Sequence, residues 1–335
     1  MKTFKTFDYE LENLKNTKPL LAFDGSISLD EWKVKAREKL MELLGLPLYA
    51  CDPCFEIEYT KEFNEFTEYR FTVQTEPGYH VPCHLLIPKG VKTPAPLAID
   101  LMGHGGGMHV ALGRAKTKSD EESLKEWPHR AMAIRAISEK RCALVIESRS
   151  FGEASANGYG TSCTEAAKIA IIMGRTTIGE RVWDVMRVLD AVSENFPQVD
   201  MRGVVCTGNS GGGTSTYYLA ALDERIEFAA PCCSVCTYED SIAAIEHCLC
   251  NHIPSIRKYF EMGDLAGLIA PRALVVAAGE KDTIFPIDGV KKAYKQIEFI
   301  YKTANCPQSC SLVIGEKGHY NYADLIWEAL HKMGV

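Results

Sequence analysis

The chain has 335 residues, of which 46% are hydrophobic and 24% are charged. This composition excludes a mainly disordered, collagen-like or fibrous protein, and the length suffices to bury a substantial core. The net charge of −7 argues against nucleic acid or an anionic membrane as a partner, because both attract proteins through basic patches.

The first 50 residues are charged and helical in pattern. Apolar residues recur at helical spacing from Trp32 to Leu43, and Gly45 and Pro47 predict the end of that helix. The N-terminus lacks the apolar run of a signal peptide, and no apolar run in the chain approaches 18 residues. We therefore expect an N-terminal helical extension over residues 1–50 and a cytoplasmic protein without a membrane segment.

Residues 55–87 change to an alternation of apolar and polar residues. The alternation covers residues 55–59, 69–73 and a run near 84–87, and Pro77 with Gly78 supplies a turn. A period of two residues is typical of strands that bury one face. We predict antiparallel strands at the edge of a sheet.

After Pro96, short apolar runs alternate with longer helical patterns. The apolar runs cover residues 97–102, 142–146, 204–207, 228–232, 273–278 and 311–314. Helices are predicted between them, at 128–139, 180–195, 212–222, 287–303 and 321–332. This alternation predicts an α/β fold with a doubly wound, mostly parallel sheet covered on both faces. We expect one catalytic domain over residues 51–335, with the polar segment 237–268 as a helical lid.

A G-x-S-x-G pattern around Ser210 follows the apolar run at 204–207 and precedes a predicted helix. Glycines at positions 208 and 212 allow a sharp turn from strand to helix, which holds the Ser210 hydroxyl clear of the sheet. The start of the helix supplies backbone N–H groups and a partial positive charge. Ser210 is therefore the predicted nucleophile.

A serine nucleophile requires a base, and the base requires a carboxylate that orients it. In this architecture the chain order is serine, acid, histidine, with the last two in loops after later strands. Asp282 follows the next-to-last predicted strand and His319 follows the last one. We predict Asp282 as the acid and His319 as the base, with Asp288 and Glu280 as alternatives for the acid.

Acyl transfer also requires donors for the developing oxyanion. A glycine-rich segment at residues 103–107 follows the first predicted parallel strand, and glycines let the backbone approach a substrate closely. We expect one donor to be the N–H of Gly211. The second comes from Gly105 or Gly106, and the sequence leaves that choice open. His104 is expected to shape this loop through hydrogen bonds.

Together these segments resemble the α/β-hydrolase superfamily. The resemblance rests on the H-G-G-G run that begins at His104, the G-x-S-x-G around Ser210, the G-E-K-D that ends at Asp282 and the G-H that ends at His319. Residues 174–184 and 269–274 are similar to segments of its acetyl xylan esterase and dienelactone-hydrolase-like branch.

The resemblance implies a serine esterase that cleaves short acyl esters, most often acetyl groups on sugars, and the predicted triad needs no cofactor. A peptidase or another acyl hydrolase of the same fold is the alternative. A catalytically inactive binding protein is the rival from another class. Substrate contacts are expected from His104, Asn209, Arg149 and His247, although Arg149 equally suits a structural ion pair. Arg181 and Asp184 are predicted on a salt-bridged helix surface.

The cysteines number thirteen, so at least one thiol has no intramolecular partner. Close pairs occur at Cys51-x-x-Cys54, Cys233-x-x-Cys236 and Cys248-x-Cys250. His247 and His252 lie near the last pair, but structural zinc usually needs two such pairs that converge on four ligands. We expect no bound metal, no disulfide between Cys306 and Cys310, and reduced thiols. A cytoplasmic enzyme would then meet esters, such as acetylated oligosaccharides, that a cell can import.

Overall fold

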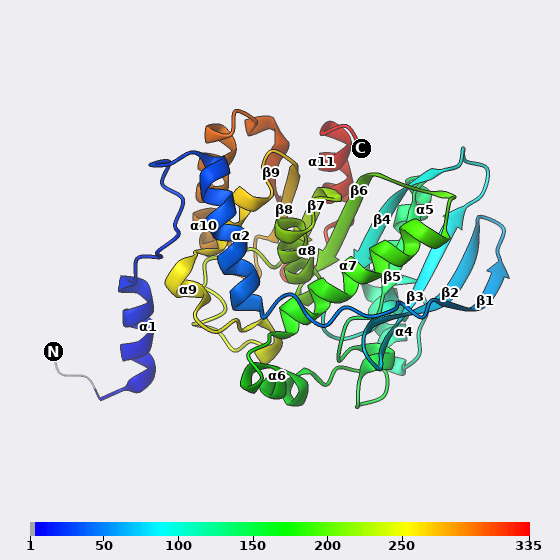
Figure 1. Ribbon diagram of the computed structural model, residues 1–335, viewed down its shortest axis with the longest axis horizontal. Helices are drawn as coiled ribbons and strands as arrows, with labels where there is room; N and C mark the ends of the chain where they lie inside the picture. The colour runs from blue at the N-terminus through cyan, green and yellow to red at the C-terminus, as the bar shows by residue number, and fades with distance from the viewer. Residues whose placement is uncertain (1–3) are drawn as a thin grey trace.

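Nine strands within residues 4–335, the part of the chain that the computed structural model describes, form one mixed sheet (Figure 1). The strands are β1 (Glu56–Glu62), β2 (Phe66–Glu76), β3 (Tyr79–Pro88), β4 (Ala95–Leu101), β5 (Cys142–Ile146), β6 (Val199–Asn209), β7 (Ile226–Cys232), β8 (Ala273–Gly279) and β9 (Cys310–Gly315). Their order is β1-β2-β3-β5-β4-β6-β7-β8-β9. The pairs from β1 to β5 are antiparallel and all later pairs are parallel, which confirms the predicted mostly parallel sheet and its antiparallel edge.

Helices fill the connections between these strands. The α-helices are α1 (Thr6–Asn16), α2 (Leu29–Leu44), α3 (Met108–Ala111), α4 (Lys118–Glu126), α5 (Met132–Ser138), α6 (Cys163–Ile172), α7 (Thr177–Asn195), α8 (Gly211–Leu222), α9 (Ile256–Tyr259), α10 (Ile287–Thr303) and α11 (Ala323–Lys332). Short 3₁₀ helices are η1 (Pro128–Arg130), η2 (Gly152–Ala154), η3 (Leu249–Asn251), η4 (Met262–Leu268) and η5 (Pro307–Ser309). The sequence did not predict α4 and α6, because α4 is polar almost throughout and α6 is apolar on most sides, so neither shows a one-sided apolar period.

Alternate residues of the central strand β4 supply two hydrophobic cores, one on each face of the sheet. Leu97 and Ile99 join the core under α2, α7, α8 and α10, whereas Ala98 joins the core under α5 and α11. Figure 1 shows α2, α7 and α8 in front of the sheet. The inner parallel strands are therefore buried on both sides, which explains why their sequences are apolar runs rather than alternating patterns.

Helix α2 belongs to the core, whereas α1 does not. The Ser28 side chain caps α2 by accepting the N–H of Glu31 at 3.2 Å, and Gly45 ends the helix in the left-handed region. Trp32 is 3% exposed and donates its indole N–H to the carbonyl of Leu21 at 2.9 Å. Helix α1 has no buried residue and lies at the periphery (Figure 1).

The segment 237–268 divides into two parts. Its end forms η4, all of whose residues are buried and which contacts α2, α8 and α10. Asp264 of η4 accepts the backbone N–H of Phe23 at 3.1 Å, so this part of the segment joins the N-terminal region to the core. The beginning carries η3, where Cys250 Sγ lies 3.2 Å from His104 Nε2. Among residues 4–335 the structure contains no helix with the length and apolar character needed to cross a membrane.

Candidate active site

Ser210 occupies a sharp turn between β6 and α8. The strand ends at Asn209, the helix begins at Gly211, and Ser210 has φ 56° and ψ −121°. Positive φ is strained for a residue with a side chain and is often found at functional sites. The Ser210 N–H donates to the carbonyl of Cys232 on the neighbouring strand β7 at 2.9 Å, which fixes the turn against the sheet.

The glycines on either side of Ser210 are required by close backbone approaches. A Cβ at Gly212 would lie 1.9 Å from the carbonyl oxygen of Leu101, at the end of β4. A Cβ at Gly208 would lie 2.4 Å from the carbonyl oxygen of Gly212. The turn therefore packs without room for side chains at these positions, which is the physical basis of the G-x-S-x-G pattern.

Asp282 and His319 are brought together from the loops after β8 and β9. His319 Nδ1 lies 2.8 Å from Asp282 Oδ2, and the Asp282 side chain is fully buried. The other carboxylate oxygen, Oδ1, accepts the backbone N–H groups of Ile284 at 2.8 Å and Phe285 at 3.1 Å. The structure thus places the predicted acid and base as partners.

The two alternatives for the acid, Asp288 and Glu280, are both exposed. His319 instead hydrogen-bonds to the carboxylate of Asp282.

The environment of Asp282 keeps its carboxylate ionised. Burial acts to raise the pKa of Asp282, but the hydrogen bond and positive charge of His319, with the N–H groups of Phe285 and Ile284, outweigh it, so the net pKa is lowered. An ionised Asp282 accepts a hydrogen bond from His319 Nδ1, which leaves Nε2 free to accept a proton.

An aromatic ring packs against one face of the His319 imidazole. Phe285 stacks on the imidazole, with 5.9 Å between ring centroids and 16° between ring planes. His247 packs on Phe285 at 5.1 Å and contacts the Ser241 hydroxyl at 2.9 Å. His247 is therefore coupled to the site through Phe285, whereas the sequence predicted a contact with substrate.

Ser210 and His319 line one small pocket of about 80 Å³. His104 and Asn209, both predicted near the substrate, line it as well. The remaining lining residues are Met102, Gly103, Trp127, Arg130, Met132, Tyr320 and Asn321. Sequence reasoning missed most of these. Tyr320 and Asn321 directly follow the predicted base, and Met102 and Gly103 directly follow β4. Trp127, Arg130 and Met132 lie between the end of α4 and the start of α5.

The glycine-rich loop after β4 lies against the turn that holds Ser210. A Cβ at Gly103 would lie 2.4 Å from the carbonyl oxygen of Asn209 and 2.9 Å from Ser210 Cβ. Gly105 adopts φ +88°, and its carbonyl accepts a hydrogen bond from Arg130 at 3.2 Å. Gly106 follows it and is buried.

Gly211 begins α8, so its N–H has no acceptor within the helix. The loop and the helix start therefore meet beside Ser210.

Arg149 lies in a buried ion network away from this pocket. Its guanidinium bonds Asp184 at 2.7 and 2.8 Å and Glu76 at 2.7 Å. The structure therefore supports the structural alternative for Arg149. Arg181 and Asp184 are only 3% and 2% exposed, so their predicted position on a surface was wrong. The reason is that α7 is covered on both sides, by the sheet and by neighbouring loops and helices.

Comparisons with known proteins agree with this architecture. The model of a family described as the Abhydrolase family matches residues 6–304. The chain is 26% identical over 256 residues to "Putative hydrolase YtaP" of Bacillus subtilis (strain 168), which covers 74% of this chain and 81% of that protein.

Solved structures share the fold at lower sequence identity. A putative acetyl xylan esterase from Bacteroides fragilis NCTC 9343 superposes with a TM-score of 0.83 at 16% identity, over 99% of this chain and 95% of that one. A glucuronoyl esterase from Solibacter usitatus gives a TM-score of 0.69 at 16% identity, over 96% of this chain and 100% of that one. The resemblance to the α/β-hydrolase superfamily is thereby confirmed.

Proposed function

The chain belongs to the Abhydrolase family, and on that premise we propose that it is a serine esterase that removes short acyl groups, acetyl above all, from carbohydrates. One observation carries the proposal. Ser210, in a strained turn at the start of α8, and His319, hydrogen-bonded to a buried Asp282, line the same pocket. A nucleophile, a base and an orienting carboxylate are the parts that acyl transfer requires.

The proposed reaction begins with proton transfer from Ser210 to His319. His319 Nδ1–H donates to Asp282, so Nε2 accepts the Ser210 proton as Oγ attacks the ester carbonyl. The carbonyl oxygen becomes an oxyanion, which the N–H of Gly211 and that of Gly105 or Gly106 stabilise. The alcohol leaves with the proton from His319, and water then hydrolyses the acyl-enzyme with His319 again acting as the base.

The size of the pocket favours a short acyl group. The pocket is small, at about 80 Å³. An acetyl group and the carbon that bears the ester oxygen fit this space, whereas a long acyl chain exceeds it. The putative acetyl xylan esterase and the glucuronoyl esterase share this fold, which supports an ester on a carbohydrate.

Aromatic rings at the pocket suit a sugar. Trp127 is 37% exposed and its ring lies edge-on to Tyr320 at 6.3 Å, and both residues line the pocket. Such rings present a flat apolar surface with polar edges, which matches a sugar ring that has C–H groups on one face and hydroxyls at its rim. We propose that the alcohol part of the substrate, such as an acetylated oligosaccharide, lies against these two residues.

Turnover of p-nitrophenyl acetate by wild type and by Ser210→Ala tests the proposal. Loss of a triad nucleophile typically costs about 10⁴–10⁶ in kcat. Ser215→Ala is the matched control, because Ser215 lies on the same helix and its hydroxyl donates to the carbonyl of Gly211 at 3.1 Å. Near-wild-type turnover by Ser210→Ala would refute the proposal.

The substrate class is tested with a panel of acetyl, butyryl, octanoyl and feruloyl esters, acetylated xylo-oligosaccharides and aminoacyl p-nitroanilides. The pocket predicts the highest kcat/KM for acetyl esters and a steep fall with chain length. A preference for the anilides would instead establish the peptidase alternative, and no turnover of any compound together with no fluorophosphonate adduct on Ser210 would establish an inactive binding protein.

A further inference from the structure

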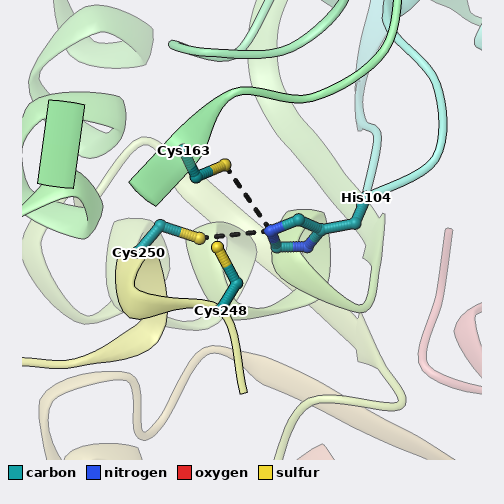
Figure 2. A group of neighbouring side chains, drawn as sticks. All are labelled: His104, Cys163, Cys248 and Cys250. Atoms are coloured by element: carbon teal, nitrogen blue, oxygen red, sulfur yellow. Dashed lines mark hydrogen bonds between the residues drawn. The ribbon is translucent and has the colours of Figure 1, made fainter. Parts of the chain in front are cut away.

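Four metal-ligating side chains from distant parts of the sequence meet beside the pocket. Figure 2 shows His104, Cys163, Cys248 and Cys250 directed at a common centre. Their ligand atoms all lie within 4.8 Å of one another, and His104 Nε2 lies 3.6 Å from Cys163 Sγ and 3.2 Å from Cys250 Sγ. All thirteen cysteines of the chain are free thiols in this structure.

We propose that this cluster binds one zinc ion. Structural zinc is tetrahedral and takes three thiolates and one imidazole as a common ligand set. With Zn–S of about 2.3 Å and Zn–N of about 2.0–2.1 Å, the edges of such a tetrahedron are about 3.5 Å for S···N and 3.8 Å for S···S. The two S···N distances of 3.2 and 3.6 Å lie on either side of the expected edge of about 3.5 Å, so these two edges already match zinc coordination.

A buried cation beside the cluster supports thiolates rather than thiols. Arg181 is 3% exposed, and no carboxylate of residues 4–335 forms an ion pair with it. Its Nη1 lies 3.7 Å from Cys250 Sγ and its Nη2 lies 3.5 Å from Cys163 Sγ. Its Nη2 also donates to the carbonyl of Arg149 at 2.8 Å, and its Nε has no hydrogen-bond partner among the described residues. A buried charge without a counter-charge is costly, so this guanidinium points to negative charge on the sulfurs.

Zinc completes the charge balance of this buried group. Zn²⁺ with three thiolates and a neutral imidazole carries a net charge of −1, and the guanidinium of Arg181 supplies +1. Binding to three protonated thiols would release three protons and form three Zn–S bonds and one Zn–N bond. Without a metal, three thiols and a histidine give Arg181 no full counter-charge.

The surroundings match a structural metal site. Cys163 and Cys250 are 5% and 1% exposed and pack with Phe151 and Cys248 in a small apolar cluster. Four protein ligands close the coordination sphere and leave no position for water, unlike a catalytic zinc site. The ion is therefore proposed to hold the structure and to take no part in ester cleavage.

Such an ion would tie the glycine-rich loop after β4 to two other segments. His104 lies in the loop after β4, Cys163 begins α6, and Cys248 and Cys250 lie at η3. His104 Nε2 faces the sulfurs, and Nδ1 of the same ring lies 3.0 Å from the position of a Cβ on Gly211. A fixed imidazole would hold the glycine loop in register with the start of α8, next to Ser210.

A second group with metal-binding atoms, Cys233, Asp282 and His319, carries no such proposal. Asp282 and His319 already bond each other in the proposed triad, so this group belongs to the site described above.

The metal content of the full-length chain tests the inference. The protein is produced with zinc in the medium, purified without chelators, freed of any tag and measured by inductively coupled plasma mass spectrometry. About one zinc per chain is expected, and Cys250→Ser should lower the content about tenfold or more. Cys51→Ser with Cys54→Ser is the matched control, because this C-x-x-C pair, with Cys51 half-buried and Cys54 exposed, lies outside the cluster and its loss should leave the content unchanged.

Two further measurements keep the test decisive if Cys250→Ser folds poorly: cobalt substitution of the wild-type chain, and substitution of Arg181, which contacts the sulfurs. Replacement of zinc by Co²⁺ in the wild-type chain should give the visible bands of a tetrahedral site with thiolate-to-metal charge transfer. Arg181→Met should weaken zinc binding about 10–100-fold, as loss of outer-sphere partners does, and Arg181→Lys should restore part of that loss because it retains the charge.

Three results would overturn the inference. They are a wild-type chain that holds no zinc even after reduction and reconstitution, a zinc content that Cys250→Ser leaves unchanged, and a disulfide among Cys163, Cys248 and Cys250 found by non-reducing peptide mapping of freshly purified protein. Because metal content is measured on resting protein, these results are independent of the esterase assay. They also decide between this proposal and the sequence-based expectation that no metal is bound.

Discussion

Replacement of Asp282 with asparagine should nearly abolish ester hydrolysis without disturbing the fold. Oδ1 of Asp282 accepts two backbone N–H groups, from Ile284 and Phe285, and an asparagine Oδ1 retains both. The changed atom is Oδ2, which lies 2.8 Å from His319 Nδ1. An amide NH₂ at that position donates a hydrogen bond, so His319 must accept it at Nδ1 and carry its proton at Nε2. Nε2 then no longer accepts the Ser210 proton.

The expected loss in kcat is about 10⁴-fold, as in serine proteases where the same substitution imposes the wrong tautomer on the histidine. KM for p-nitrophenyl acetate should change little, because Asp282 is fully buried and does not line the pocket. The free energy of unfolding should fall by about 1–3 kcal/mol at neutral pH, since a charged hydrogen-bond partner of His319 is replaced by a neutral one.

Steady-state kinetics on wild type, Asp282→Asn and Asp288→Asn measure the effect. Asp288→Asn is the matched control, because it makes the same chemical change six residues along the chain at an exposed position. It should retain wild-type kcat. A loss of less than tenfold in Asp282→Asn, or an equal loss in both variants, would refute the assignment of Asp282 as the acid.

Three further predictions concern the fold. Gly212→Ala should lower the free energy of unfolding by about 3 kcal/mol or more and abolish activity, because its Cβ would lie 1.9 Å from the carbonyl oxygen of Leu101. Gly160→Ala is the control, because its Cβ would meet an ordinary contact at 3.6 Å, and equal melting temperatures of the two variants would contradict the packing of the turn. Burial raises the pKa of Asp100 from 3.8 to about 7, so between about pH 4 and 7 the folded chain keeps a proton that the unfolded chain releases. The free energy of unfolding therefore falls as the pH rises through this range, by up to about 4 kcal/mol at 1.36 kcal/mol per pKa unit. Asp100→Asn should raise the melting temperature at pH 8 more than at pH 4.5, and an equal shift at both pH values would contradict this prediction. Trp32→Ala should cost about 3–5 kcal/mol in chemical denaturation, and a loss below about 1 kcal/mol would contradict a core role for α2.

The sheet and its order of strands and helices were accessible to sequence reasoning because each signal is local. Strands buried on both faces are short apolar runs, and the run at residues 142–146 coincides with β5. The turn at Ser210 was accessible for a related reason, since its glycines are demanded by backbone contacts within a few residues and with the adjacent strand. Asp282 and His319 followed from the chain order that this architecture imposes.

The features that sequence reasoning missed depend on contacts between distant segments. Arg181 looks like a surface residue on a periodic helix, and only the packing of α7 shows that its guanidinium lies among cysteines. His104 and the three thiols of the cluster come from the segments after β4, β5 and β7, so no spacing in the sequence predicts that they meet. The sequence offered one weaker signal for the cluster: residues that follow the carboxyl ends of neighbouring parallel strands converge on one edge of the sheet.

The central claim is that Ser210 is a nucleophile activated by His319, and covalent labelling tests it most directly. The protein is treated with a fluorophosphonate, its intact mass is measured, and the modified peptide is sequenced by tandem mass spectrometry. We expect one adduct per chain, on Ser210, that is absent from Ser210→Ala and forms far more slowly in His319→Ala. The absence of an adduct on the folded wild-type chain, or its appearance on another residue, would contradict the account.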